Sequence, residues 1–444
     1  MTKRNVGVFA IFLLASTIAM GWGLALIQRT RGIILDYRLA DFGARCLIHH
    51  CDLYNEPEME RFYLAHGGER TNSTPSAGET TKYLAGFQVY PPSAELFFAP
   101  FALFSWPVSY VSWIAISLVL VTIAAFLMWD VARVYTPDPP FYLACFLLVN
   151  SGGLLAGGNP AAAAVSLGVI GVWSVLQNRF PSVGVICIAV SLAIKPHDAG
   201  FVWLYLICLG ATFRRRAVQS CVLMTLFAIA GVLWVRQVSP GWIQKLLSNL
   251  AALASNGSCN DPAGPAAISM VNLQTLLAFF RNDPRFYNSL SFAICAPLIL
   301  VFLFTAIRLK RSPKGIWLGL ATIAVLSLLP VYHRPHDAKI LLLTLPACAM
   351  MWAEGGPTAW LALLFTGGGI VVTSELPLIF LQVFAVSPTS GIRARVLYLL
   401  TTRPAPLILF AESFFFLYVY VKHYRSAQED DVSARPAGLL RSVR

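Results

Sequence analysis

The residues best suited to chemistry in this chain gather in three short polar stretches between long apolar runs. The first opens with Asp36 and reads Asp36-Tyr-Arg-Leu-Ala-Asp-Phe-Gly-Ala-Arg45. The second is Lys195-Pro-His-Asp198, and the third is Tyr332-His-Arg-Pro-His-Asp-Ala-Lys339. A carboxylate can accept a proton as a general base, whereas lysine, arginine and histidine can hold a phosphate. These residue types indicate a site that activates a hydroxyl beside a bound phosphate.

Asp36 lies just beyond the first apolar run, at the expected membrane surface. As a structural residue it would cap a helix or pair with Arg31 or Arg38. As a functional residue it would hold a carboxylate where a lipid-borne substrate emerges, and position alone leaves both interpretations open. Asp41 is five residues further on, about 140° around a helix, so the two would not share a face. We expect Asp41 to be a surface or salt-bridge residue, and Asp52 to be a turn residue that caps the next segment.

Lys195 separates two apolar runs, 180–194 and 199–213. A lysine at such depth either snorkels to the interface or has a partner. Its neighbours His197 and Asp198 favour a site, because phosphate is the anion that lysine usually binds as a point charge.

The third stretch carries more charge than an interfacial anchor requires. Three interpretations are open: a metal site of His333, His336 and Asp337, a plain polar loop, or contact with a substrate phosphate. The His-x-x-His spacing fits one helical turn, but Pro335 disfavours helical geometry at Arg334. We therefore favour phosphate or substrate contact and expect no metal here.

Composition determines which elements must position these residues. The chain has 444 residues, of which 57% are hydrophobic and 12% charged, against about 25% charged in soluble domains. Long uncharged runs cover 5–28, 96–129, 139–178, 217–235, 286–307, 315–332, 355–374 and 376–392, and shorter ones cover 180–194, 199–213 and 340–353. A helix needs about 20 apolar residues to cross the hydrocarbon. We predict an all-α polytopic integral membrane protein with about 11 to 13 hydrophobic helices.

Four segments need comment. The run 139–178 contains Gly157-Gly-Asn-Pro160, so it must form two helices. The segment 91–105 is short and opens with two prolines, and we expect it to enter the membrane without crossing fully. The segment 376–392 could be a span or a re-entrant piece, so the exact count stays open. The run 5–28 is too long for a signal peptide's apolar core, and we expect a retained span.

The formal charge of +12 comes from small basic clusters between the apolar runs. Such clusters are typical of positive-inside anchors rather than of a nucleic-acid-binding surface, and we expect no nucleic-acid partner. They place the chain in the inner (plasma) membrane with loops 29–90, 239–285 and 333–339 outside, in the periplasm. The domain would span 1–425, and 426–444 would form a cytoplasmic tail. Cys46, Cys51 and Cys259 would then face an oxidising compartment, with Cys51–Cys259 or Cys46–Cys51 as the candidate disulfide.

Taken in order, the motifs resemble those of the polyprenol-phosphate-dependent glycosyltransferases of the GT-C fold. The closest match is glycosyltransferase family 87, which includes mycobacterial phosphatidylinositol-mannoside mannosyltransferases. The matching motifs are Asp36 to Arg45, Asp52-Leu53-Tyr54, Tyr90-Pro91-Pro92, Ala99-Pro100, Trp106-Pro107, Gly158-Asn159, Ile194-Lys195-Pro196, Asn272-Leu273-Gln274-Thr275 and His333-Arg334-Pro335-His336-Asp337. They span roughly residues 5–355. The chain departs from the family at His49-His50-Cys51, Tyr37 and His336, which bears on the sugar and acceptor more than on the chemistry.

The resemblance implies a transmembrane glycosyltransferase of the cell envelope. It would move a hexose, mannose first, from a polyprenyl-phosphate sugar to a lipid or glycan acceptor at the outer face, among membrane lipids, with inversion and without a metal or other cofactor. Asp36 would be the catalytic base, and the donor phosphate would bind Lys195, His333, Arg334 and His336. The resemblance further implies substrate contacts from Tyr90, Asn159, Asn272, Gln274 and Asp337.

Two other classes remain as alternatives. A transporter or flippase of a lipid-linked or anionic solute would place its polar residues mid-span in broken, repeated helices, whereas here they gather at one face. A polysaccharide polymerase or ligase would concentrate basic residues in one large late loop, whereas here the motifs that indicate function begin in the early loop after the first apolar run.

Overall fold

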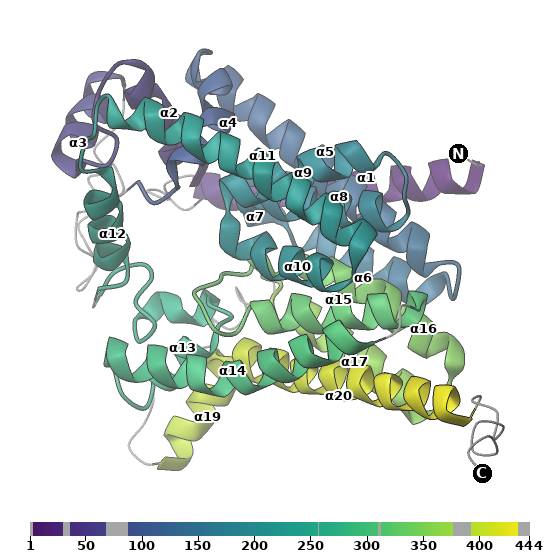
Figure 1. The fold of residues 1–444 in the computed structure, drawn as a ribbon. Coiled ribbons are helices and arrows are strands. Elements are labelled where there is room, and N and C mark those ends of the chain that lie inside the picture. The colour runs from purple at the N-terminus through teal and green to yellow at the C-terminus, as the bar shows by residue number, and fades with distance from the viewer. Residues whose placement is uncertain are drawn as a thin grey trace, which may run out of the picture.

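The computed structural model describes residues 3–29, 36–67, 88–255, 257–309, 312–375 and 392–433. Every regular element in these ranges is a helix, and none is a strand (Figure 1). The prediction of an all-α protein is therefore confirmed.

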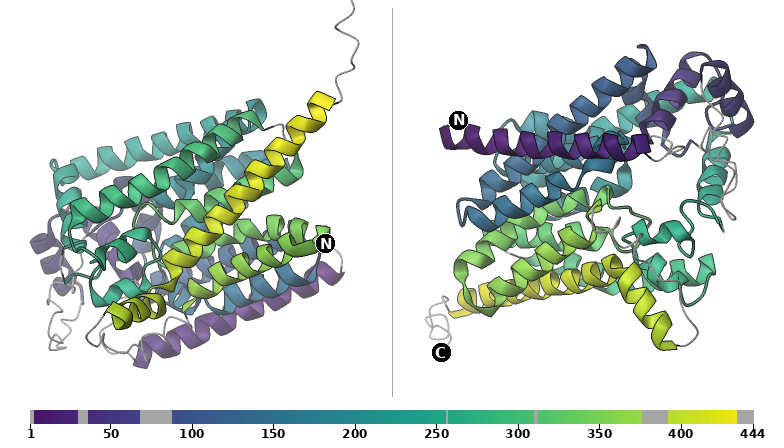
Figure 2. Two further views of the ribbon diagram at one scale, coloured as in Figure 1. Left: turned by 90° about the horizontal axis from the view of Figure 1, so that it is seen from below. Right: turned by 180° about the vertical axis from the view of Figure 1, so that it is seen from behind.

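Five helices are long and apolar enough to cross a membrane. They are α1 (Lys3–Arg29), α5 (Trp106–Ala132), α11 (Ala211–Arg236), α14 (Pro284–Arg308) and α20 (Pro404–Ser433). At 1.5 Å per residue each is longer than the roughly 30 Å of hydrocarbon, which confirms a polytopic membrane protein. Figure 2 shows α20 crossing the bundle obliquely, where it packs on α14 and on two shorter helices, α15 (Pro313–Ser327) and α17 (Gly356–Val372).

Shorter apolar helices fill the space between the long ones. They are α6 (Asp138–Val149), α8 (Ala161–Leu176), α9 (Pro181–Ile194), α10 (Pro196–Cys208) and α16 (Leu345–Glu354), with the 3₁₀ helix η3 (Asp337–Thr344) leading into α16. The possible span at 376–392 lies almost wholly outside the described residues, so the total number of hydrophobic helices stays a prediction.

The run 139–178 is broken twice rather than once. It forms α6, the short helix α7 (Gly152–Ala156) and α8. The additional break lies at Asn150 and Ser151, whose side chains donate to the carbonyls of Phe146 and Leu147 at 2.9 and 2.7 Å. Side chains that bond to nearby carbonyls compete with the helix in this way, and the expectation of two helices missed this competition.

A layer of short elements covers one end of the bundle. It contains α2 (Asp36–Ile48), α3 (Glu56–Ala65), α4 (Pro92–Ala102), α12 (Trp242–Leu253), η2 (Pro265–Ser269), α13 (Leu273–Ala278) and α19 (Ile392–Thr402). In Figure 1, α2, α3, α12, α13 and α19 lie towards the left, and the start of α1 and the end of α20 towards the right. The 11 residues of α4 reach only about 16 Å, as expected for 91–105. Which end faces the cytoplasm stays a prediction.

Aromatic packing fixes α2 on the bundle. The ring of Tyr37 stacks on Trp113 of α5 with a centroid distance of 4.9 Å, and its hydroxyl hydrogen-bonds Ser109 at 2.9 Å. At the other end of α2, Cys46 and Cys51 form a disulfide, so the bridge closes within the segment after α1, and Cys259 is a free thiol. The helix that begins with Asp36 is thus anchored along its length.

Candidate functional site

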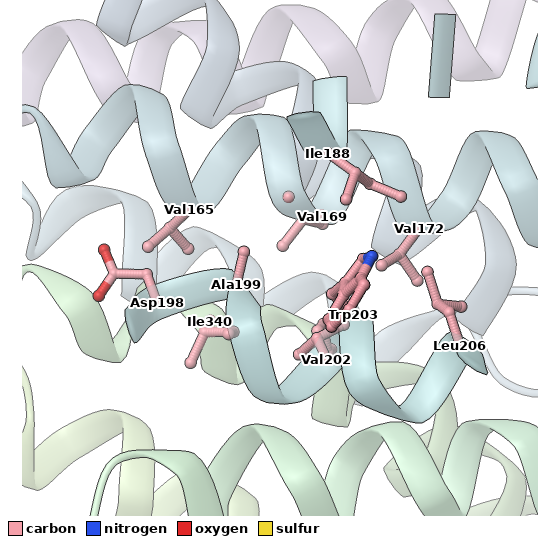
Figure 3. Close-up of a pocket in the computed structure, with 12 residues that line it drawn as sticks. Val165, Val169, Val172, Ile188, Asp198, Ala199, Val202, Trp203, Leu206 and Ile340 are labelled. Carbon is pink, nitrogen blue, oxygen red and sulfur yellow. The ribbon is translucent and has the colours of Figure 1, made fainter. Parts of the chain in front are cut away.

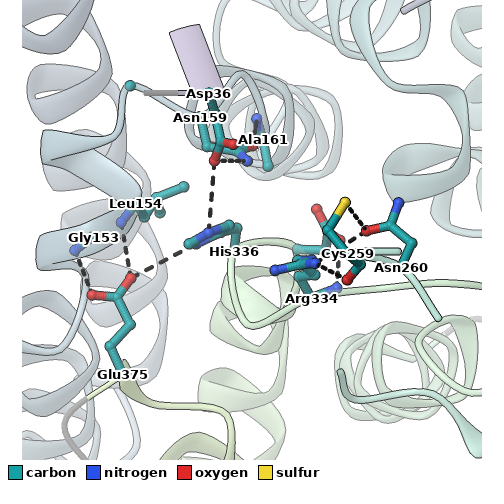
Figure 4. A network of polar contacts seen from close by, with 12 residues as sticks. Asp36, Gly153, Leu154, Asn159, Ala161, Cys259, Asn260, Arg334, His336 and Glu375 are labelled. Carbon is teal, nitrogen blue, oxygen red and sulfur yellow. Dashed lines mark hydrogen bonds and ion pairs between the residues drawn. The ribbon is translucent and has the colours of Figure 1, made fainter. Parts of the chain in front are cut away.

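Asp36 begins α2 and stands at the edge of the covering layer. Its side chain is 45% exposed, and its Oδ2 accepts a hydrogen bond from Nδ2 of Asn159 at 2.7 Å. The amide orientation of Asn159 is fixed, because its Oδ1 accepts a hydrogen bond of 2.8 Å from the backbone N–H of Ala161 at the start of α8. The carboxylate is therefore held through one oxygen while the group as a whole stays accessible (Figure 4).

The glycines before Asn159 bring these two residues together. The backbone N–H of Tyr37 donates to the carbonyl of Gly157 at 3.1 Å. Gly158 has a φ of 63°, and a Cβ at that position would lie 2.7 Å from the Cβ of Tyr37. Only glycine meets both demands readily, which gives the Gly-Asn motif a physical reason.

His336 lies between two carboxylates that come from opposite ends of the chain. Its Nε2 is 3.9 Å from Oδ2 of Asp36, and its Nδ1 is 3.7 Å from Oε1 of Glu375. Glu375 in turn accepts from the backbone N–H groups of Gly153 and Leu154 at 2.5 and 2.9 Å, at the start of α7. Burial lowers the pKa of His336, outweighing the opposite effect of Glu375 and Asp36. The result is a chain of polar groups from α7 to Asp36 (Figure 4).

Lys195 forms the turn between α9 and α10 and is a paired cation. Its Nζ contacts Oδ1 of Asp337 and lies 3.6 Å from Oδ2 of Asp198. Oδ2 of Asp337 accepts from the backbone N–H of Arg334 at 2.8 Å. Although burial opposes it, the charge of Lys195 lowers the pKa of Asp337, so this pair is ionised. The alternative of a lysine that simply snorkels does not describe this side chain, which is only 14% exposed.

Arg334 belongs to a second group of contacts on the same loop. Its guanidinium donates to the hydroxyl of Tyr332 at 2.5 Å, to the carbonyl of Cys259 at 2.7 Å and to Oδ1 of Asn260 at 3.0 Å. The loop after α15 and the segment after α12 are thus joined through one side chain. The acceptors from Tyr332, Cys259 and Asn260 are uncharged, so Arg334 keeps a positive charge available to an anion.

Tyr90 connects the two halves of the site. Burial raises the pKa of its hydroxyl, and the charge of Asp36 raises it further while that of Lys195 lowers it. The phenol therefore lies within electrostatic range of both the carboxylate and the paired lysine. Its backbone carbonyl accepts from the hydroxyl of Tyr54 at 2.7 Å, which ties Tyr90 to the segment between α2 and α3.

His333 faces inward rather than towards Asp36. Its side chain is 1% exposed, and its Nε2 lies 3.7 Å from Oδ1 of Asp198. His197 reaches the same oxygen, with its Nε2 at 3.5 Å. His197, Asp198 and His333 form the one group with metal-ligand geometry in the described part of the chain. This set differs from the His333, His336 and Asp337 set considered from the sequence, because Pro335 turns the two histidines apart and no helix forms before Asp337.

The remaining predicted residues lie beside the site. Asn272 donates to Gln274 at 2.6 Å, and Gln274 donates to Asn288 at 2.5 Å. The backbone N–H of Val271 donates to the carbonyl of His333 at 3.1 Å. The backbone at Val271 therefore supports the loop that begins at His333, and Asn272 and Gln274 follow directly after this contact.

The other two aspartates of the first loop are structural. Asp41 pairs with Arg45 at 2.6 Å and accepts from Ser109 at 2.6 Å, and it is fully buried. The expected salt bridge of Asp41 is present. The alternative of a surface position is wrong, because the contacts of Tyr37 and Ser109 pack this face of α2 against the bundle. Asp52 accepts from the backbone N–H of Tyr54 at 3.1 Å, as a turn residue does, and also pairs with Lys245.

An apolar crevice reaches the polar site from within the bundle. Its lining comes from α8, α9, α10 and η3, and Asp198 stands at one end of the labelled residues (Figure 3). The walls are mostly valine, leucine and isoleucine with Trp203. The polar cluster around Lys195 therefore borders directly on apolar surface.

The arrangement combines an accessible carboxylate, a histidine beside it and two cations on neighbouring loops. Such a set can remove a proton from a hydroxyl and stabilise negative charge that develops nearby. The sequence led to Asp36, Asn159, Tyr90, Lys195 and the loop 333–337, and the structure brings these together. It did not lead to Glu375, and it assigned no role to Tyr332, which opens the third polar stretch. The available signal for Glu375 was its position as the one charge between the apolar runs 355–374 and 376–392.

Comparison with known proteins adds one finding. The family model described as Glycosyltransferase family 87 matches residues 87–331, more than half of the chain. No curated protein and no solved structure matches the chain significantly. The matched region includes Tyr90, Asn159 and Lys195, and Asp36 and the loop 333–337 lie on either side of it.

Proposed function

The chain belongs to glycosyltransferase family 87, and on that premise we propose that it transfers a hexose, mannose first, from a polyprenyl-phosphate sugar to a hydroxyl of a lipid or glycan acceptor at the outer face of the membrane. The coarser statement, a membrane-embedded glycosyltransferase, follows from the family and the long apolar helices. The donor, the acceptor and the side of the membrane belong to the proposal.

The observation that carries the proposal is the environment of Asp36. A general base must be ionised, accessible and held in place. Asp36 has an exposed side chain at the start of α2 and a single fixed donor, Asn159. The other two aspartates of the first loop, Asp41 and Asp52, are paired with Arg45 and Lys245.

In the proposed reaction Asp36 takes the proton of the acceptor hydroxyl. The acceptor oxygen attacks the anomeric carbon from the side opposite the phosphate, and the bond from that carbon to the phosphate oxygen breaks. The bonding electrons leave with the lipid phosphate, and the configuration of the sugar inverts. His336, 3.9 Å from Asp36, would orient the carboxylate or a substrate hydroxyl.

Charge on the leaving phosphate needs cations close to it. The guanidinium of Arg334 donates hydrogen bonds only to uncharged acceptors, so its positive charge is not neutralised by them. We therefore assign Arg334 the first contact with the leaving phosphate. Lys195 would add a second by exchanging part of its contact with Asp337 for the phosphate. His333 is turned towards Asp198, so we assign it a supporting position behind Lys195.

A metal at the reacting atoms is not part of the proposal. A lipid phosphate leaves with less charge than a nucleotide diphosphate, and the sequence has no Asp-x-Asp motif in its outer loops. Two cationic side chains suffice for a monophosphate leaving group of this kind.

The direct test is transfer by the purified full-length protein. The protein would be incubated with a panel of radiolabelled polyprenyl-phosphate sugars and a total membrane lipid extract, and products would be separated by thin-layer chromatography. We expect a labelled product from one donor, with mannose the first candidate. Sealed proteoliposomes give a control: movement of the labelled donor across the bilayer without a new product would indicate a flippase and contradict the proposal.

A further inference from the structure

Three buried polar atoms converge at the turn between α9 and α10 without a hydrogen-bond partner. They are Nε2 of His197, Oδ1 of Asp198 and Nε2 of His333. Asp198 and His333 are at least nine-tenths buried, at 3% and 1% exposure. Buried polar groups in folded proteins nearly always have a partner, so three that face one another call for a specific explanation.

The tautomer of His333 sharpens the problem. Its Nδ1 lies 3.0 Å from the carbonyl of Val331, and because a carbonyl can only accept, Nδ1 must carry the proton. In the neutral ring Nε2 is then a lone pair aimed at Oδ1 of Asp198, 3.7 Å away. Two acceptors that face each other repel unless a proton or a metal ion lies between them, and 3.7 Å is too long for a hydrogen bond through a shared proton. A backbone carbonyl that orients one ring nitrogen is also the usual outer support of a metal-bound histidine.

The neighbouring charges do not supply that positive group. Lys195 lies 3.6 Å from the other oxygen of Asp198, Oδ2, and makes its closer contact with Asp337. Among the described residues, none donates a hydrogen bond to Oδ1 of Asp198 or forms one with the Nε2 atoms of His197 and His333, so this position is open to a cation.

The separations suit a metal ion. Ligands held about 2.0–2.1 Å from a tetrahedral zinc ion lie about 3.4 Å from one another. Here the imidazole nitrogens lie 3.5 and 3.7 Å from the shared carboxylate oxygen, and all three ligand atoms are within 4.8 Å of each other. We propose that a divalent cation of the zinc type binds between His197, Asp198 and His333. Two imidazoles and one carboxylate favour zinc or cobalt over magnesium and calcium, which prefer oxygen ligands.

The ion has a structural task in this position. His197 and Asp198 belong to the first turn of α10, whereas His333 belongs to the loop after α15. The metal ties these two segments together and so sets the distance between Lys195 and Asp337. The ion joins segments that flank the proposed phosphate site but takes no part in the transfer reaction. A metal at this position therefore does not require any particular substrate.

The test is the metal content of the full-length protein. Protein purified in detergent without chelator would be incubated with Zn²⁺, Co²⁺, Mn²⁺ or Mg²⁺, desalted and analysed by plasma mass spectrometry. We expect about one Zn²⁺ or Co²⁺ per chain and far less Mn²⁺ or Mg²⁺. Bound Co²⁺ should show the visible absorption of a low-coordinate site. Asp198→Asn and His197→Ala should each lower the content at least about tenfold, since even outer-shell changes cost that much.

His336→Ala is the matched control, because it removes a histidine from the same loop but outside the three ligands. It should keep the wild-type metal content. Asp198→Asn has the shape of the native residue and His197 is 38% exposed, so at least one variant should give monodisperse protein for comparison. Wild-type protein with less than about one tenth of an ion per chain would overturn the proposal. So would unchanged content in Asp198→Asn and His197→Ala, or a loss caused by His336→Ala alone.

Discussion

Replacing Asp36 by asparagine should abolish most transfer while leaving the protein folded. The substitution keeps the shape of the side chain, and the amide oxygen of the new residue can still accept the hydrogen bond that Asn159 donates at 2.7 Å. What disappears is the proton acceptor. Loss of a general base costs about 10²–10⁴-fold in rate, or about 3–5 kcal/mol in the barrier. Because the side chain is 45% exposed, unfolding free energy should change by only about 0.5 kcal/mol.

The assay is initial-rate transfer from a radiolabelled polyprenyl-phosphate mannose to membrane lipid, with protein in nanodiscs and the amount of folded protein measured by size exclusion. Asp283→Asn is the matched control. Asp283 caps α14 through the N–H of Arg285 at 3.0 Å, lies at the same covered end, and asparagine caps a helix about as well. It should transfer at the wild-type rate.

Near-normal turnover by Asp36→Asn would refute the assignment, above all if Asp41→Asn were inactive at equal amounts of folded protein. The comparison must be made per folded molecule because Asp41 is buried with Arg45 and Ser109. Breaking a buried pair commonly costs about 3–5 kcal/mol, so loss of protein alone would not identify Asp41 as the base.

Three further results are expected. Lys195→Met should lower both the melting temperature and the transfer rate, because it leaves Asp337 unpaired. The double variant Lys195→Met with Asp337→Asn should recover the melting temperature but not the transfer rate. Recovery of both would show that Lys195 has only a structural role. Glu375→Gln should lower the stability by about 1–3 kcal/mol and slow transfer, with Glu354→Gln as the control, and an unchanged melting curve would contradict the capping of α7. Transfer without added Mg²⁺ or Mn²⁺ should proceed at the full rate, and dependence on either ion would place a metal at the reacting atoms.

Much of this architecture could be predicted because lipid leaves a strong pattern in sequence. Long uncharged runs predict α1, α5, α11 and α14, and their interruption by polar stretches predicts where the site lies. The break at Gly158 follows from glycine and proline alone. The break at Asn150 does not, because it depends on side chains that bond to their own helix's carbonyls and the same residues occur inside intact helices.

The internal arrangement of the site could be predicted less well. The sequence placed His333 and His336 in one group. Because Pro335 lies between them, the segment has no helical periodicity from which to infer where each ring points, and the two rings face different partners. The contact of Glu375 with the start of α7 joins residues more than 200 positions apart. A single sequence contains no local signal for such a contact, and the isolated charge between two apolar runs indicates only that something must compensate it.

The position of His336 between Asp36 and Glu375 has a consequence for how the enzyme is made. The first of these carboxylates leaves the ribosome more than 300 residues before the second, which corresponds to about 20–70 s of synthesis. During that interval the membrane holds a chain that has the proposed base, Asp36, but lacks Glu375, the second carboxylate beside His336. A nascent or truncated chain ending before Glu375 should therefore be inserted and inert. Synthesis of nearly the whole polypeptide thus precedes the first moment at which the site can act.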